Sequence, residues 1–239
     1  MSIEVRNLVK KFDDRVVIND ISFKVADGEI LAIVGFSGSG KSTVLKLICG
    51  LIPFDNGEIL TSEGDIAMVF QYSALFDSLN VFDNISFALR ERKDLRKKYS
   101  EKELKEIVSQ KLELVGLQGI ENKFPSELSG GMQKRVSFAR AIVTKPNTIL
   151  YDEPTAGLDP MSSTLIEDYI VRLKRETNAA SIVVTHQMST ITRTADRVIM
   201  LYDGKIVFEG TPEQLLKQDN PYTKQFVTAS LDGPMKMKA

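Results

Sequence analysis

Apolar residues along the chain fall into short continuous or alternating runs, separated by stretches in which they recur every three or four positions. Between residues 3 and 34 the segments IEVRNLV, RVVI and ISFKV alternate, which predicts antiparallel strands. ILAIV (30–34) is apolar throughout, which is typical of a strand buried on both faces of a mostly parallel sheet. We expect its neighbours in that sheet to be TILYD (148–152) and SIVVTH (181–186).

Helical patterns lie between these predicted strands. They cover Lys41–Cys49 ended by Gly50, Lys134–Val143 ended by Lys145-Pro146, and Met161–Glu176 entered through Asp159-Pro160. Later in the chain, VIMLYDGKIVFEG predicts a hairpin that turns at Asp203-Gly204.

Residues 74–140 carry no strand pattern. Ser100 and Glu103 match a capping box, and apolar residues follow them at helical spacing. We interpret this stretch as a helical subdomain inserted into an α/β core. The chain, 1–239, is then a single domain. Its α/β core with the β-subdomain occupies 1–73 and 141–225, and its tail, 226–239, is either a flexible end or a clasp on a neighbouring copy.

Composition narrows the class of protein. The chain has 31 Lys and Arg against 32 Asp and Glu, so no basic field predicts binding to nucleic acid or to an anionic membrane. Its single cysteine, Cys49, excludes an internal disulfide and fits a reducing compartment. The charged start does not suit a signal peptide, and the apolar runs are too short to span a bilayer. We expect a cytosolic protein that reaches membranes through a partner.

The stretch from Gly35 to Ser42, GFSGSGKS, matches G-x-x-x-x-G-K-[ST] between a predicted buried strand and a predicted helix. Glycines let successive backbone N–H groups converge on phosphate oxygens, and the helix start adds its dipole. Lys41 would neutralise the β- and γ-phosphates, and the Ser42 hydroxyl would ligate Mg²⁺. The competing interpretation, a structural glycine-rich turn, leaves the lysine unexplained. The motif predicts a nucleoside triphosphate site.

Two acidic residues lie at the end of the predicted strand TILYD: Asp152 is its last residue, and Glu153 follows it. Asp152 can hold Mg²⁺ through water, and Glu153 can orient or deprotonate a water that attacks the γ-phosphate. An isolated acidic pair would more often be a solvated loop, but after a buried strand in a P-loop protein the pair favours hydrolysis.

Two further features are ambiguous by themselves. His186, the only histidine, ends the predicted strand SIVVTH, where either a structural or a ligand-contacting role is possible. Ser129-Gly130-Gly131 precedes a helix and could be an ordinary cap or a second phosphate site.

Together these motifs resemble the ATPase subunits of ABC transporters, over nearly the whole chain. The ordered set is the Walker A stretch GFSGSGKS, Gln71 in VFQYSALF, the signature LSGGM, Walker B ILYDE, the D-loop AGLD and His186 in the switch position. The resemblance implies a P-loop, RecA-like α/β core, ATP and Mg²⁺ as ligands, and ATP hydrolysis. It also implies a head-to-tail pair of copies, with each nucleotide between one P-loop and the other copy's signature.

The resemblance also implies roles for single residues. Catalytic contacts fall to Glu153 as base, His186 at the γ-phosphate and Gln71 at Mg²⁺, with Ser42 and, through water, Asp152 as the other metal ligands. The residues implied to bind ATP are Phe12, stacked on adenine, and Gly35, Phe36, Ser37, Gly38, Ser39, Gly40, Lys41, Ser42 and Thr43. Those implied to act in trans are Ser129, Gly130, Gly131 and Met132 of the signature, with Asp159 of the D-loop coupling the two sites.

Two positions depart from the family pattern. Met132 replaces the usual glutamine of the signature, beyond the Ser and Gly that touch phosphate, so we expect activity to survive. Phe36 replaces a residue that is often proline, and we expect its bulk to point away from the phosphates.

ALFDSLNVFDNISFALRE, SELSGGM and QFVTASLDGP resemble the ATPases of Mla- and Mce-type phospholipid transport systems. This implies an inner-membrane permease, a lipid-binding Mce-domain partner and a place on the cytosolic face of that membrane. Some such systems add a STAS-domain subunit, which no residue here demands. The alternatives are an amino-acid or osmolyte permease, a soluble ABC ATPase without a membrane partner, and a nucleotide-gated binding module without useful hydrolysis.

Overall fold

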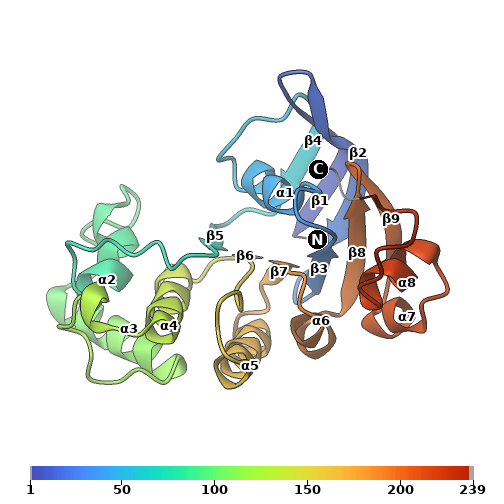
Figure 1. Cartoon of the computed structure of the whole chain (residues 1–239). Coiled ribbons are helices and arrows are strands. Elements are labelled where there is room, and N and C mark those ends of the chain that lie inside the picture. The colour runs from blue at the N-terminus through green and yellow to red at the C-terminus, as the bar shows by residue number, and fades with distance from the viewer. Residues whose placement is uncertain (1, 237–239) are drawn as a thin grey trace.

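The computed structural model describes residues 2–236, which form two sheets and the helices that cover them (Figure 1). One sheet has the order β2-β1-β4, with β1 (Ile3–Phe12) antiparallel to both β2 (Arg15–Val25) and β4 (Asn56–Thr61). The segments RVVI and ISFKV therefore form one strand, not two. Asp20, at φ +59°, lies between them, where the pairing of β1 and β2 shifts register.

The second sheet has the order β5-β6-β7-β3-β8-β9. Its strands are β5 (Ile66–Val69), β6 (Thr148–Asp152), β7 (Ala180–Val184), β3 (Ile30–Val34), β8 (Arg197–Tyr202) and β9 (Lys205–Gly210). All pair in parallel except β9, which forms the predicted hairpin with β8. All five residues of β3 are buried, as its apolar pattern predicts.

Of the two predicted neighbours of β3, one is confirmed (β7) and the other is wrong (β6). β3 lies between β7 and β8, whereas TILYD (β6) pairs with β5 and β7. Strand order in a parallel sheet depends on which crossover helices pack on which face, and an apolar run carries no trace of that choice. The strand predicted as SIVVTH ends at Val184, so His186 lies two residues beyond the sheet.

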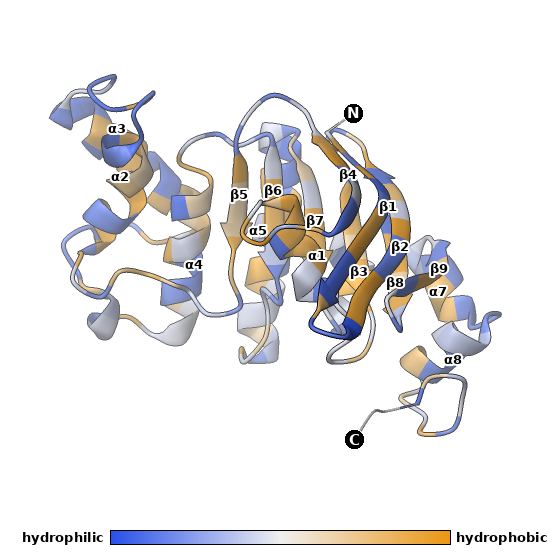
Figure 2. Ribbon diagram, turned by 90° about the horizontal axis from the view of Figure 1, so that it is seen from above, coloured by the Kyte–Doolittle hydropathy of each residue, from blue (hydrophilic) through white to orange (hydrophobic). Residues whose placement is uncertain are grey.

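The helices α2 (Val81–Glu91), α3 (Glu101–Leu114) and α4 (Gly130–Ala141) lie together beyond the β5 edge of the sheet (Figures 1 and 2). Ser100 and Glu103 form the predicted capping box of α3. A short 3₁₀ turn, Pro125–Glu127, precedes α4. The prediction that α4 begins at Lys134 is wrong: Ser129 is its N-cap and accepts a hydrogen bond from the backbone N–H of Met132, so both signature glycines are helical.

The remaining helices pack on the two faces and at the far edge of the larger sheet. They are α1 (Lys41–Ile48), α5 (Pro160–Thr177), α6 (Met188–Thr194), α7 (Pro212–Lys217) and α8 (Pro221–Val227). No helix within residues 2–236 is both long and apolar enough to cross a membrane.

The tail folds back on its own chain, as far as residue 236. Met235 is buried, and its backbone N–H and C=O bond to the side-chain amide of Gln225, at 2.7 and 2.8 Å. The backbone N–H of Lys236 donates to the Tyr202 hydroxyl at 3.0 Å. Residues 226–236 therefore pack against their own chain, whether the tail also contacts a neighbouring copy stays a prediction, and residues 237–239 lie outside the described part.

We expect Gln225→Ala to release this tail, because it leaves two backbone groups of Met235 without partners in an apolar setting. The cost to the free energy of unfolding should be about 2 kcal/mol. Urea denaturation measures it, and proteolysis after Lys236 should become faster. Gln110→Ala, on an exposed position of α3, serves as the control. An unchanged urea midpoint for Gln225→Ala would show that the hydrogen bonds between Gln225 and Met235 contribute nothing to stability.

Candidate functional site

The loop between β3 and α1 is a backbone cradle that side chains would fill. Gly35, Gly38 and Gly40 have φ values of +146°, +76° and +98°. A Cβ on Gly35 would lie 2.4 Å from the Leu201 carbonyl oxygen, and one on Gly40 would lie 2.7 Å from Ile18 Cδ1. Gly40 is the N-cap of α1 and brings no side-chain cap, so the first N–H groups of the helix stay available to an anion.

Lys41 closes the cradle. Its ammonium donates to the carbonyl oxygens of Gly35 and Phe36, both at 2.9 Å. Burial lowers the pKa of Lys41, and the carboxylates Glu153 and Asp152 oppose that shift. A partly desolvated cation beside free N–H groups is an environment that phosphate oxygens would complete.

Ser42 and Asp152 supply the oxygen ligands that Mg²⁺ prefers. The Ser42 hydroxyl donates to Asp152 Oδ1 at 2.8 Å, so the two groups already lie within reach of one ion. Across residues 2–236 no cluster of three or more His, Cys, Asp or Glu could hold a metal by itself. The pair therefore fits an ion that takes its remaining ligands from phosphates and water, which is the usual mode for Mg²⁺.

The parallel pairing of β6 with β7 brings Glu153 and His186 together. The backbone N–H of Glu153 donates to the Val184 carbonyl at 2.9 Å, and His186 Nδ1 lies 2.9 Å from Glu153 Oε1. Because an ionised carboxylate only accepts, Nδ1–H is the donor and Nε2 is left for another partner. Glu153 Oε2 is buried and has no hydrogen-bond partner among the described residues. Glu153 adopts φ +46°, an unfavourable backbone conformation that is typical of functional sites.

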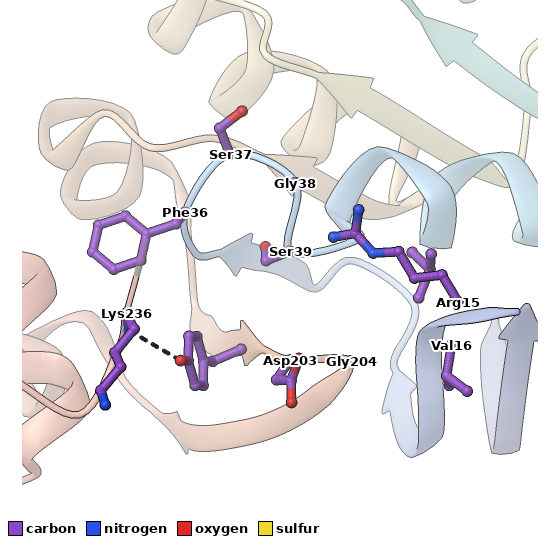
Figure 3. A pocket seen from close by; sticks show the side chains of 11 residues that line it. Arg15, Val16, Phe36, Ser37, Gly38, Ser39, Asp203, Gly204 and Lys236 are labelled. Carbon is purple, nitrogen blue, oxygen red and sulfur yellow. Dashed lines mark hydrogen bonds between the residues drawn. The ribbon is translucent and has the colours of Figure 1, made fainter. Parts of the chain in front are cut away.

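These residues line one cavity of about 760 Å³. The predicted site residues on its wall are Phe12, Gly35, Phe36, Ser37, Gly38, Gly40, Lys41, Ser42, Thr43, Gln71, Glu153 and His186. Asp152 touches the site through Ser42. Ser39 lies beside Gly35 and lines an adjoining cavity of about 500 Å³, together with Lys236 (Figure 3).

Five further residues line the larger cavity and were missed by sequence reasoning: Arg15, Val17, Met188, Phe226 and Ala229. The last two belong to the tail and its helix, which carry no local signal for a ligand. The ring of Phe36 projects outward from the loop (Figure 3), and its centroid lies 6.3 Å from that of Phe226 in an edge-to-face arrangement. The expectation that Phe36 points away from the phosphates stays a prediction, since Phe36 also lines the larger cavity.

A separate cavity of about 310 Å³ contains Ser129, Gly130, Gly131 and Asp159. Asp159 caps α5, and hydrogen bonds from Ser162 and Met161 lower its pKa. Met132 does not line this cavity and packs against the apolar cluster of the helical region. Among the described residues none lines both this cavity and the larger one.

Lys134 links the two regions from α4. Its ammonium donates to the carbonyl oxygens of Pro154 and Ala156, in the segment that follows Glu153. Burial lowers the pKa of Lys134, and Glu153 opposes the shift. The helix that begins at the signature therefore contacts the segment beside the candidate base.

Comparison with known proteins identifies relatives of this arrangement. The model of a family described as "ABC transporter" matches residues 18–156. The chain is 44% identical to the protein TRIGALACTOSYLDIACYLGLYCEROL 3, chloroplastic, of Arabidopsis thaliana, over 98% of this chain and 75% of that protein. It is 41% identical to the intermembrane phospholipid transport system ATP-binding protein MlaF of Haemophilus influenzae, over 99% and 94%.

Among solved structures, the fold resembles a dimeric ATP-binding cassette in a post-hydrolysis state, bound to ADP and Pi. The TM-score is 0.78 at 29% identity, covering 88% of this chain and 98% of that one.

We expect Lys41→Met to remove most of the affinity for ATP, because it deletes the buried cation that the cradle presents to phosphate. Loss of charge-assisted hydrogen bonds of about 1.5–3 kcal/mol each predicts a decrease of about a hundredfold. Titration with a fluorescent ATP analogue measures it. Lys46→Met, on the exposed face of the same helix, should bind like the unaltered protein. Equal affinities for the two variants would remove Lys41 from the site.

Proposed function

This chain belongs to the ABC transporter family as an ATP-binding subunit that hydrolyses ATP, and we propose that its transporter moves phospholipid between the membranes of a double-membrane envelope. The observation that supports phospholipid as the cargo is the near full-length similarity to a phospholipid transport ATP-binding protein. The segments QFVTASLDGP and SELSGGM resemble those of the lipid-transport branch and support the same assignment.

The cradle holds the triphosphate through the backbone N–H groups of residues 35–43, with Lys41 on the β- and γ-phosphates. Phe12, half exposed on the cavity wall, offers a ring on which adenine stacks. Ser42, Gln71 and, through water, Asp152 would hold Mg²⁺, which when bound neutralises charge on the phosphates. The contact between Ser42 and Asp152 supports this placement.

Glu153 acts on the water that attacks the γ-phosphorus. Its buried, unpartnered Oε2 can accept a proton from that water. The water oxygen forms the new bond to phosphorus while the bond to the β–γ bridging oxygen breaks, giving ADP and phosphate. His186 would leave Glu153 Oε1 and contact the γ-phosphate. Because 61% of the His186 side chain is exposed, this movement meets little packing resistance.

A second copy completes each site. Ser129 and Gly131 lie in a cavity of their own, away from the cradle, so they reach a γ-phosphate only when supplied by another chain. They would then stabilise charge on the transferred phosphoryl group, as an arginine finger does elsewhere. Asp159, in the same cavity, would couple the two sites.

The proposed helical subdomain, 74–140, transmits nucleotide state to a permease in the inner membrane. Exposed aromatic residues follow Gln71 in the chain: Tyr72 is 80% exposed, and Phe76 and Phe87, whose ring centroids are 4.8 Å apart, are 44% and 40% exposed. Such a patch suits a cytosolic helix of a membrane partner. On the cytosolic face this chain would meet that permease; a lipid-binding Mce-domain protein, and in some systems a STAS-domain subunit, would complete the assembly.

Glu153→Gln is expected to bind ATP with unchanged affinity and to lose at least about a hundredfold in turnover, because the amide cannot take a proton from water. Steady-state phosphate release and nucleotide titration measure the two quantities. Glu106→Gln on α3 provides the matched control. Turnover at the unaltered rate would overturn the role given to Glu153.

The cargo is tested by purifying the tagged chain with its partners from native membranes in mild detergent. Mass spectrometry of proteins and lipids should find a permease and an Mce-domain protein with enriched phospholipid. An amino-acid or osmolyte permease without lipid enrichment would keep the ATPase and reject the cargo. Recovery of no membrane protein would favour a soluble ABC ATPase.

A further inference from the structure

A buried carboxylate lies behind the catalytic groups, outside the cavity that they line. Glu167, on α5, is 1% exposed. A buried charge is costly unless partners compensate it, so a carboxylate at this position indicates a specific arrangement around it. The sequence motifs do not include this residue.

The partners of Glu167 all lie on α6. Its Oε1 accepts hydrogen bonds from the hydroxyls of Ser189, at 3.0 Å, and Thr190, at 2.8 Å. Arg193 Nε lies 2.9 Å from its Oε2 as an ion pair. Three side chains from one short helix therefore converge on one carboxylate of α5.

The network continues from Thr190 to Thr155. The two hydroxyl oxygens are 3.0 Å apart, and both residues are completely buried. A hydroxyl has one proton, and that of Thr190 goes to the carboxylate. Thr155 must therefore be the donor to Thr190, so the proton donors point in one direction, from Thr155 through Thr190 to Glu167.

Both ends of this network lie next to the reacting groups. Thr155 follows Glu153 by two residues, and α6 begins two residues after His186. The Glu167 carboxylate is thus linked to two segments, one running from Glu153 to Thr155 and one from His186 into α6. The first residues of these segments, Glu153 and His186, make the 2.9 Å contact. Glu167 also belongs to α5, which Asp159 caps in the other cavity.

We propose that Glu167 is a positioning residue for ATP hydrolysis, which sets His186 relative to Glu153 through α6 and Thr155. The proposal rests on the roles given above to Glu153 and His186. Glu167 touches neither the cradle nor the phosphates, so it should affect the rate at saturating ATP and leave nucleotide affinity alone. A purely structural carboxylate would instead change the stability of the fold.

Glu167→Gln tests this, because it keeps the shape and one acceptor oxygen while removing the charge. We expect kcat to fall about tenfold, since small misplacements of catalytic groups carry losses of this order or more. KM and the affinity for an ATP analogue should stay within about twofold of the unaltered protein. Asp168→Asn is the control: it is adjacent, exposed, and pairs with the same Arg193 from the solvent side, so its kcat should not change.

Thr155 provides a second test that does not remove a buried charge. Thr155→Val deletes the proton donor with little change of volume and should lower kcat, whereas Thr155→Ser keeps the hydroxyl and should restore it. The Thr155→Val and Glu167→Gln losses should not multiply in the double variant, because both act through one network. Multiplicative losses, or a lowered unfolding midpoint with unchanged kcat, would overturn the proposal.

The failure of this proposal is distinguishable from failure of the proposed catalytic roles. If Glu153→Gln turns over normally, the base is misassigned whatever Glu167 does. If Glu153→Gln is inactive while Glu167→Gln and Thr155→Val turn over normally, the base stands and the positioning role falls.

Discussion

Parallel hydrogen bonding between β6, β7 and β3 aligns the carboxyl ends of three buried strands, and the positions of the candidate catalytic groups depend on that alignment. Asp152 pairs with Val184, and Ile33 pairs with the same residue on the other side. The cradle, the two carboxylates and the segment that carries His186 therefore leave the sheet at one level. A shift of one residue in either register would turn these side chains to other faces, so the buried apolar strands also fix the geometry of the site.

Charge is concentrated at this edge at some cost to the fold. The ammonium groups of Lys41 and Lys134 are partly desolvated, which lowers their pKa values, and both face Glu153. Glu153 in turn has an unfavourable φ and an unpaired buried oxygen. If these groups act on ATP as proposed, their fixed positions would leave little reorganisation for the chemical step. The buried apolar strands behind these groups stabilise the fold enough to offset the cost of such a site.

The contacts behind the site join its parts mechanically. Lys134 ties the helix after the signature to the segment 154–156, and Glu167 ties α5 and α6 to Thr155 in that same segment. The short stretch after Glu153 therefore receives contacts from the helical region through Lys134 and from α6 through Thr190, which in turn bonds to Glu167 of α5. Its polar partners and the packed interior around it leave this stretch few alternative positions.

The sequence by itself determined several features that short contiguous motifs encode. The cradle of residues 35–42, the capping box at Ser100 and the hairpin at Asp203-Gly204 follow from backbone freedom, capping and turn chemistry, which act over a few residues. Burial of β3 followed from its apolar run. The catalytic roles of residues in these motifs remain predictions for the variants described above.

Tertiary structure decided what depends on distant partners. It placed β8 rather than β6 beside β3, folded the tail onto Gln225 and Tyr202, and buried Glu167 against α6. None of these carries a local signature, because a glutamate on a helix reads as a solvated position until the neighbouring helix is known. Local pattern specifies which elements form and where chemistry can occur, whereas long-range packing specifies which side chains hold that chemistry in place.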